Sequence, residues 1–157
     1  MITTKADVKI LAALYSLAGN GAPETSTTGQ VGDIYLDIDE TSETYGDSWE
    51  LTAISEGVYT WTSLPGEDAR IILLIGRAEQ DYLNIRGRAF DVVDDSTAYP
   101  DGSDLVAAEM VCYLMGVYEG RGRESESAAG RSMSYERKIG GYPISIVGQI
   151  DRYVEVG

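Results

Sequence analysis

The spacing of the apolar residues changes twice along this 157-residue chain, and that change limits the folds open to it. In residues 4–18 the apolar positions recur every three or four residues, as on one face of a helix. These positions are Val8, Leu11, Tyr15 and Ala18. Thr4 and Asp7 have the spacing of a capping box, and Gly-Asn-Gly follows as a stop signal. We therefore expect a first helix from Thr4 to Ala18.

Residues 20–66 differ from the first segment because their apolar side chains alternate with polar ones. The runs GDIYLDI, WELTAI and VYTWTSL each place every second side chain on one face, and turn-forming residues bound each run. The segment also holds nine acidic residues and no Lys or Arg. It is predicted to form a small antiparallel meander of three strands.

Helical spacing returns after the acidic segment and predicts three further helices. They are expected at 67–86, 103–118 and 143–154. The middle one, capped by Ser103 or Asp104, is apolar on nearly every face and should be central. Residues 90–102 read as a connection with turn signals.

The fold class predicted from these patterns is mainly α. A four-helix domain is expected from residues 1–19 and 67–157, with an acidic β-rich insertion at 20–66.

The formal net charge is −14, and the chain contains no histidine. It therefore has no Ser–His or Cys–His pair and no imidazole metal ligand. The acidic balance opposes gripping nucleic acid, which depends on Lys and Arg at the phosphates. The single cysteine, Cys112, is expected to be a buried thiol in a reducing compartment. Neither a signal peptide nor a membrane span is expected from the apolar runs.

Three chemical hypotheses concern the acidic segment. Closely spaced carboxylates at 37–40 suggest calcium, but an EF-hand requires Gly and Glu where the chain has Ser42 and Ser48. A carboxylate enzyme using Asp37 and Asp39 ranks last, because nothing sets their separation. A glycan-binding platform, or equally the core of a small sheet, is suggested by Tyr35, Tyr45, Trp49, Tyr59 and Trp61.

Four motifs resemble the head-tail connector, or adaptor, proteins of long-tailed bacteriophages. They are TTKADVKILAAL, RAEQDYLNIRGRAFD, YPDGSDLVAAEMVCYLMG and ESESAAGRSMSYERKIGGYPISIVGQIDRYV, in that order. The resemblance covers residues 2–18 and 67–154. Residues 20–66 depart from it and look like a hairpin of phage tail-fibre and surface proteins, which suggests a decoration outside the ring.

The resemblance implies a structural virion protein and no catalysis or cofactor. Its subunits would form a homo-oligomeric ring, a dodecamer in this family, between the portal protein and the next neck component. That component would be a head-completion (stopper) or tail protein. Genomic DNA would pass through the central channel without specific binding, and no membrane is involved. The ring would lie in the virion neck after assembly in the host cytoplasm. The alternative is a binding module that recognises glycan or a host surface through the aromatic, acidic insertion.

Two sets of contact residues follow from the resemblance. A polar segment between the last two helices, with charges of alternating sign, is expected to contact the neighbouring subunit as an edge strand or arm. Its residues are Arg123, Glu124, Glu126, Arg131, Ser134, Tyr135, Glu136, Arg137 and Lys138. The alternative is a disordered surface loop. Portal docking is assigned to Arg152, Tyr153, Val154, Glu155 and Val156.

Overall fold

The computed structural model describes residues 1–117, 123–126, 133–135 and 137–150. The chain divides into two compact units, and the boundary falls inside the longest helix. One unit is Thr4–Leu73, and the other joins Met1–Thr3 to the chain from Leu74 onward. The division expected from the sequence, 1–19 and 67–157 against 20–66, stays a prediction.

Helix α1 (Lys5–Leu11) opens the first unit. The predicted capping box is confirmed, because the Thr4 side chain accepts from Asp7 N–H while the Asp7 carboxylate accepts from Thr4 N–H. The predicted extension of this helix to Ala18 is wrong. The chain leaves the helix at Ala12–Ala13, where Ala13 has φ +51°, and becomes strand β1 (Leu17–Gly19).

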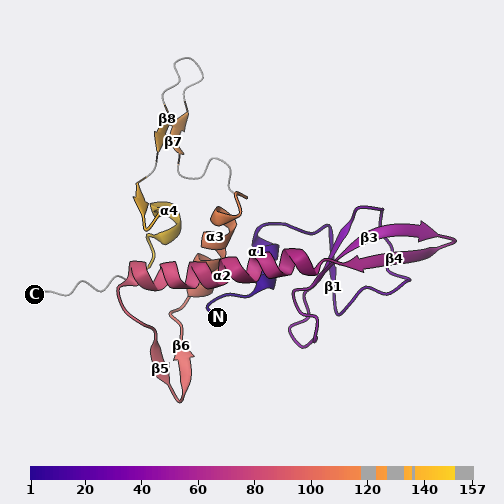
Figure 1. Cartoon of the computed structure of the whole chain (residues 1–157), viewed down its shortest axis with the longest axis horizontal. Helices are drawn as coiled ribbons and strands as arrows, with labels where there is room; N and C mark the ends of the chain where they lie inside the picture. Colours follow the sequence, from indigo (N-terminus) through magenta and orange to yellow (C-terminus); the bar gives the residue numbers. More distant parts are fainter. Residues whose placement is uncertain (118–122, 127–132, 136, 151–157) are drawn as a thin grey trace, which may run out of the picture. The chain divides into compact units, whose positions relative to one another are not determined.

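A four-stranded sheet follows α1 in this unit, in the order β1-β2-β3-β4. Its other strands are β2 (Ile34–Asp37), β3 (Ser48–Ser55) and β4 (Val58–Ser63). The last three pair antiparallel, which confirms the predicted meander, whereas β1 pairs parallel with β2. Figure 1 shows β3 and β4 as a long ribbon. Hydrogen bonds from Ser16 N–H to Ile34 O and from Ile38 N–H to Gly19 O fasten β1 to β2 and stabilise extended backbone after α1.

Helix α2 (Pro65–Arg86) begins in the first unit and continues into the second. The predicted apolar face is confirmed at Ile71, Ile75, Ala78 and Tyr82, which are buried, whereas its fifth member, Ile85, is only partly buried. Helix α3 (Ser103–Leu114) buries seven of its residues, including Cys112, as expected of a central helix. Its N-cap is Gly102 without a side-chain hydrogen bond, so the predicted Ser103 or Asp104 cap is wrong.

The remaining elements of the second unit are short. Residues 90–102, expected to be a plain connection, include the hairpin of β5 (Asp91–Val93) and β6 (Ser96–Ala98). After α3 come β7 (Arg123–Glu126) and β8 (Met133–Tyr135), then β9 (Lys138–Ile139) and β10 (Tyr142–Pro143). Helix α4 (Ile144–Val147) has four residues and ends at the C-cap Gly148, so the helix predicted over 143–154 is wrong at 148–150. Residues 151–154 of that prediction lie outside the described residues.

The predicted fold class is therefore wrong: the protein is a mixed α/β fold, with a four-stranded sheet, rather than mainly α. Of the four helices in the described ranges, α1 with seven residues and α4 with four are too short to form a bundle. Backbone hydrogen bonding to β2 replaced the end of the first helix, and hairpins formed where turn signals had indicated only connections. The first outcome depends on a partner distant in the sequence, which local spacing does not report. The β5–β6 hairpin is a local pairing, and its turn residues were interpreted only as part of a connection.

Candidate functional site

The polar segment predicted to contact a neighbouring subunit forms an antiparallel ribbon between α3 and α4 (Figure 1). Arg123, Glu124 and Glu126 lie on β7, and Ser134 and Tyr135 lie on β8. Arg123 pairs with Tyr135, and a register shift follows before the next pair. The segment is thus strand-forming in the described part. Its role as an interface stays a prediction.

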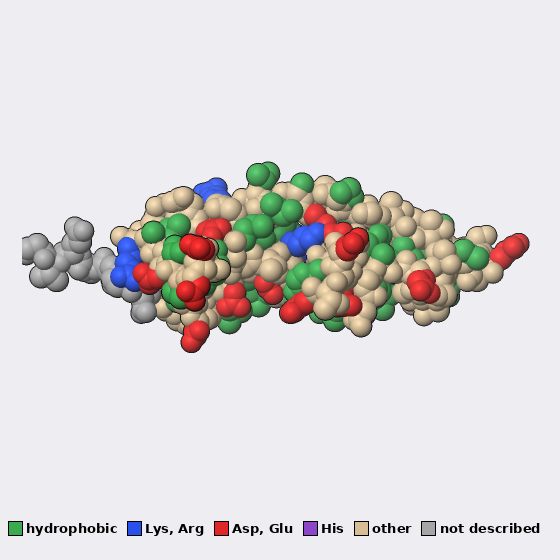
Figure 2. Space-filling model, turned by 90° about the horizontal axis from the view of Figure 1, so that it is seen from below, with side chains coloured by type: hydrophobic (Ala, Val, Ile, Leu, Met, Phe, Trp, Pro, Cys, Tyr) green, Lys and Arg blue, Asp and Glu red, His purple; other side chains and the backbone are tan. Residues whose placement is uncertain are grey.

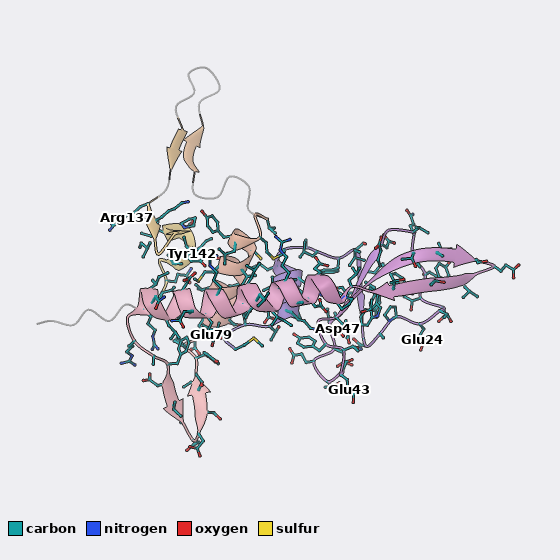
Figure 3. All side chains as sticks on the ribbon, viewed as in Figure 1. Glu24, Glu43, Asp47, Glu79, Arg137 and Tyr142 are labelled. Carbon is teal, nitrogen blue, oxygen red and sulfur yellow. The ribbon has the colours of Figure 1, made fainter. Side chains whose placement is uncertain are left out.

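The chain just after this ribbon is fixed to α3 by one side chain. Lys138 Nζ donates to the Tyr113 hydroxyl at 2.8 Å and lies 5.5 Å from the centre of the Tyr113 ring. The carbonyl of Arg137 accepts from Ile144 N–H at 2.9 Å, which holds the start of α4 against β9. Both Arg137 and Lys138 are exposed, and Figure 3 labels Arg137 at this place.

The turn between β9 and β10 is fixed to α2. Gly140 has φ +59°, and a Cβ at that position would lie 2.8 Å from Ile85 Cγ1, so only glycine allows this close approach. The buried Tyr142 hydroxyl donates to Asp81 Oδ2 at 2.8 Å. Burial, with the hydrogen bond to Asp81 second, raises the pKa of Tyr142. The ribbon thus leads into a turn that is held by α2 and α3.

Some of the predicted contact residues lie outside the described part of the chain. They are Arg131 and Glu136 of the subunit contact, and Arg152, Tyr153, Val154, Glu155 and Val156 of the portal contact. These assignments stay predictions.

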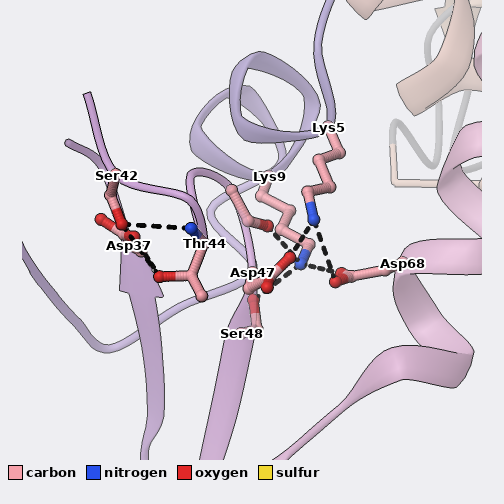
Figure 4. A network of polar contacts seen from close by, with 9 residues as sticks. Lys5, Lys9, Asp37, Ser42, Thr44, Asp47, Ser48 and Asp68 are labelled. Atoms are coloured by element: carbon pink, nitrogen blue, oxygen red, sulfur yellow. Dashed lines mark hydrogen bonds and ion pairs between the residues drawn. The ribbon is translucent and has the colours of Figure 1, made fainter. Parts of the chain in front are cut away.

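The acidic segment is organised around one buried carboxylate, Asp37 (Figure 4). Its oxygens accept from Gly21 N–H at 2.9 Å, Asp39 N–H at 3.0 Å and the Thr44 hydroxyl at 2.7 Å. Burial alone would raise the pKa of Asp37, but hydrogen bonds from Ser42, Asp39, Thr44 and Gly21 together lower it. Asp37 is therefore a structural carboxylate that orders the loop after β2. Among the described residues, no three Asp, Glu, Cys or His side chains converge as a metal site.

A buried lysine in the same unit was not predicted from the sequence. Lys9 is fully buried; its Nζ pairs with Asp68 and donates to Gly46 O at 2.9 Å and Ser48 Oγ at 2.8 Å. Lys5 pairs with Asp47 and, at 3.4 Å, with Asp68 (Figure 4). The two lysines thus join α1 to the beginning of strand β3 and to the first turns of α2. A polar residue on a short amphipathic helix gives no signal of burial.

The aromatic residues of the sheet pack on one another. The buried Tyr35 ring lies edge-on to Trp49 at 6.1 Å and to Trp61 at 5.8 Å between centroids. Trp61 Nε1 donates to Thr27 O at 3.2 Å. These contacts account for the three rings as the core of a thin sheet. The glycan-binding hypothesis stays a prediction.

Comparison with family models, curated proteins and solved structures finds no match to this chain. Within the described ranges, none of the helices combines the length and apolar character needed to cross a membrane.

Proposed function

We propose that this chain is a subunit of the head-tail connector ring in the neck of a long-tailed bacteriophage. The ring, a dodecamer by the resemblance, would lie between the portal protein and a stopper or tail protein. Genomic DNA would pass through its centre. The four ordered motifs of the sequence are the starting point of this proposal.

The observation that carries the proposal is the form of the polar segment between α3 and α4. The described parts of this segment pair as β7 and β8, and the following turn is anchored through Lys138–Tyr113 and Tyr142–Asp81. A ribbon with a fixed base suits a subunit that reaches a neighbour, because a heterologous contact repeats around a closed ring. A polar loop serving only as a connection would not need such a base.

The charge of the chain also supports the proposal. With twenty-six acidic and twelve basic residues, the protein does not neutralise phosphates in the manner of a DNA-binding protein. A channel with an acidic lining allows DNA to move without adhering. The chemistry expected of this subunit is therefore assembly rather than catalysis.

Light scattering after size exclusion tests the proposal, on the protein alone and mixed with the portal protein of the same phage. We expect a ring of uniform mass in at least one of the two conditions, and a portal-bound complex in the second. A chain that remains a monomer in both would contradict the proposal. If the chain stays a monomer and its Trp49 and Trp61 emission shifts when glycans are added, the binding-module alternative would be favoured.

A further inference from the structure

The β5–β6 hairpin is exposed over nearly its whole length. Residues 91–97 are all exposed, including Val92 at 68% and Val93 at 57%. Consecutive strand residues point to opposite faces, so each face of the hairpin carries an uncovered valine. A two-stranded hairpin on its own is marginally stable in water. This hairpin therefore has apolar surface on both sides without a core of its own.

The base of the hairpin, by contrast, is held by aromatic rings. Phe90 precedes β5 and Tyr99 follows β6, and their rings meet edge-on at 4.9 Å between centroids. Phe90 also lies 5.7 Å from the Tyr82 ring, and the Tyr99 hydroxyl donates to Glu79 Oε1 at 3.4 Å. Both Tyr82 and Glu79 belong to α2.

Two arginines add to this base. Arg86 Nη1 donates to Ala89 O at 2.9 Å, and its guanidinium lies 5.2 Å from the centre of the Phe90 ring. Arg88 Nη2 donates to both Asp91 carboxylate oxygens, at 3.0 and 2.8 Å. The hairpin is thus fixed to α2 at its base and uncovered beyond it, which is the form of an arm presented to a partner.

The charges identify which surface suits this arm. Residues 90–104 contain five Asp and no Lys or Arg, and the turn consists of Asp94 and Asp95 in left-handed backbone conformation. Figure 2 shows acidic side chains over the hairpin. The chain has one pair of consecutive basic residues, Arg137–Lys138, and both are exposed. In Figure 1 the hairpin and β9 lie on opposite sides of α2.

We propose that the β5–β6 hairpin of one subunit docks on the surface that carries Arg137 and Lys138 in a second copy. This inference rests on the proposed ring. A twofold contact centred on the hairpin would set acidic turn against acidic turn, in a chain that already carries a charge of −14. Pairing the acidic turn with the basic pair avoids that repulsion and makes the contact head-to-tail, as a ring requires.

Charge reversal tests this contact in whichever condition the wild type assembles, alone or on the portal. D94K/D95K and R137E/K138E should each lose assembly, because each sets like charges together. A mixture of the two variants should regain it, since every contact then joins opposite charges. A single chain with all four changes should regain it too. E40K/E43K, which changes the net charge as much as D94K/D95K, is the matched control and should assemble normally.

A cross-link measures the same contact directly. V93C and R137C proteins, both in a C112A background, should be joined by a short bismaleimide in their mixture far more than in either protein alone. Circular dichroism checks that each variant folds, and R137E alone replaces the double variant if K138E disturbs the Tyr113 contact.

If the wild type forms rings and the charge-reversal variants assemble equally well, the docking contact is overturned. The proposed function would then still stand. Folded variants whose mixture stays at monomer mass would also overturn it. A wild type that is monomeric in both conditions would overturn the docking contact and the ring together.

Discussion

The Tyr142 hydroxyl donates a 2.8 Å hydrogen bond to the Asp81 carboxylate, and this bond ties β10 to α2. Tyr142 is buried, while the Asp81 side chain is 27% exposed. Arg77 Nε lies 3.7 Å from Asp81 Oδ2. The Tyr142 ring also lies 5.8 Å from the Tyr113 ring on α3. One side chain thereby holds the turn that follows the β7–β8 ribbon against two helices.

Replacing Tyr142 with Phe should lower the free energy of unfolding by about 1–2 kcal/mol, the cost of losing a hydrogen bond to a carboxylate that water can partly reach. Tyr113→Phe is the matched control. Its hydroxyl accepts from the exposed Lys138, so the loss should be smaller. Urea unfolding followed by circular dichroism measures both. Equal losses in the two variants would contradict the importance assigned to Tyr142.

Stability should fall as the pH rises above about 10. Burial raises the pKa of Tyr142, and Asp47 and Asp68 outweigh the opposing effect of burial to raise the pKa of Lys5. For both groups the folded state holds the proton more tightly than the unfolded state. Their stabilising contribution is complete below the unfolded pKa and is lost as the pH rises through the folded one. Chemical unfolding between pH 8 and about 11 measures the slope, and Tyr142→Phe should flatten it.

Lys9→Met should lower the free energy of unfolding by about 3 kcal/mol or more. It removes one of the two lysines that pair with the Asp68 carboxylate, whose side chain is only 13% exposed. Changing Asp68 to Met as well should recover part of that loss, since a buried pair replaced by apolar side chains is often tolerated. Arg70→Met, on the exposed part of α2, is the control and should change stability by less than about 0.5 kcal/mol. A double variant less stable than Lys9→Met would refute the pairing.

Asp37→Asn should destabilise the first unit by about 2–3 kcal/mol. The amide nitrogen would face the Thr44 hydroxyl, from which the carboxylate oxygen now accepts a hydrogen bond. The lowered pKa of Asp37 means that its contribution is complete above the unfolded value and is lost as the pH falls through the folded one. The Asn variant should therefore lose less stability on acidification. Glu40→Gln, at an exposed site, is the control. Calcium that raises the wild-type melting temperature would contradict a purely structural role.

Some features were readable from local patterns. The Thr4–Asp7 capping box, the apolar face of α2 and the burial of Cys112 depend on residues near one another in the chain. The end of α3 was predicted too late: the helix was expected to reach residue 118 but ends at Leu114, and Gly116 follows with φ +78°. The acidic meander followed from period-two alternation in the same way.

The candidate site was predicted only in part. The polar composition and charges of 123–138 indicated a contact segment, but its pairing as β7–β8 and its anchoring to Tyr113 were not foreseen. The exposed β5–β6 hairpin was read as a connection. Its turn residues, Asp94 and Asp95, were the available signal, because Asp tolerates left-handed conformation.

The sequence by itself determined where α1 and the three strands of the acidic meander begin, through a capping box, turn residues and the spacing of apolar side chains. Tertiary structure decided which of them continued. Residues 12–19 left the helical conformation because β2 supplied backbone partners, and Lys9 became buried because Asp68, Gly46 and Ser48 met it from distant segments. These outcomes depend on hydrogen bonds and charges that form only when remote parts of the chain come together, and local spacing carries no record of them.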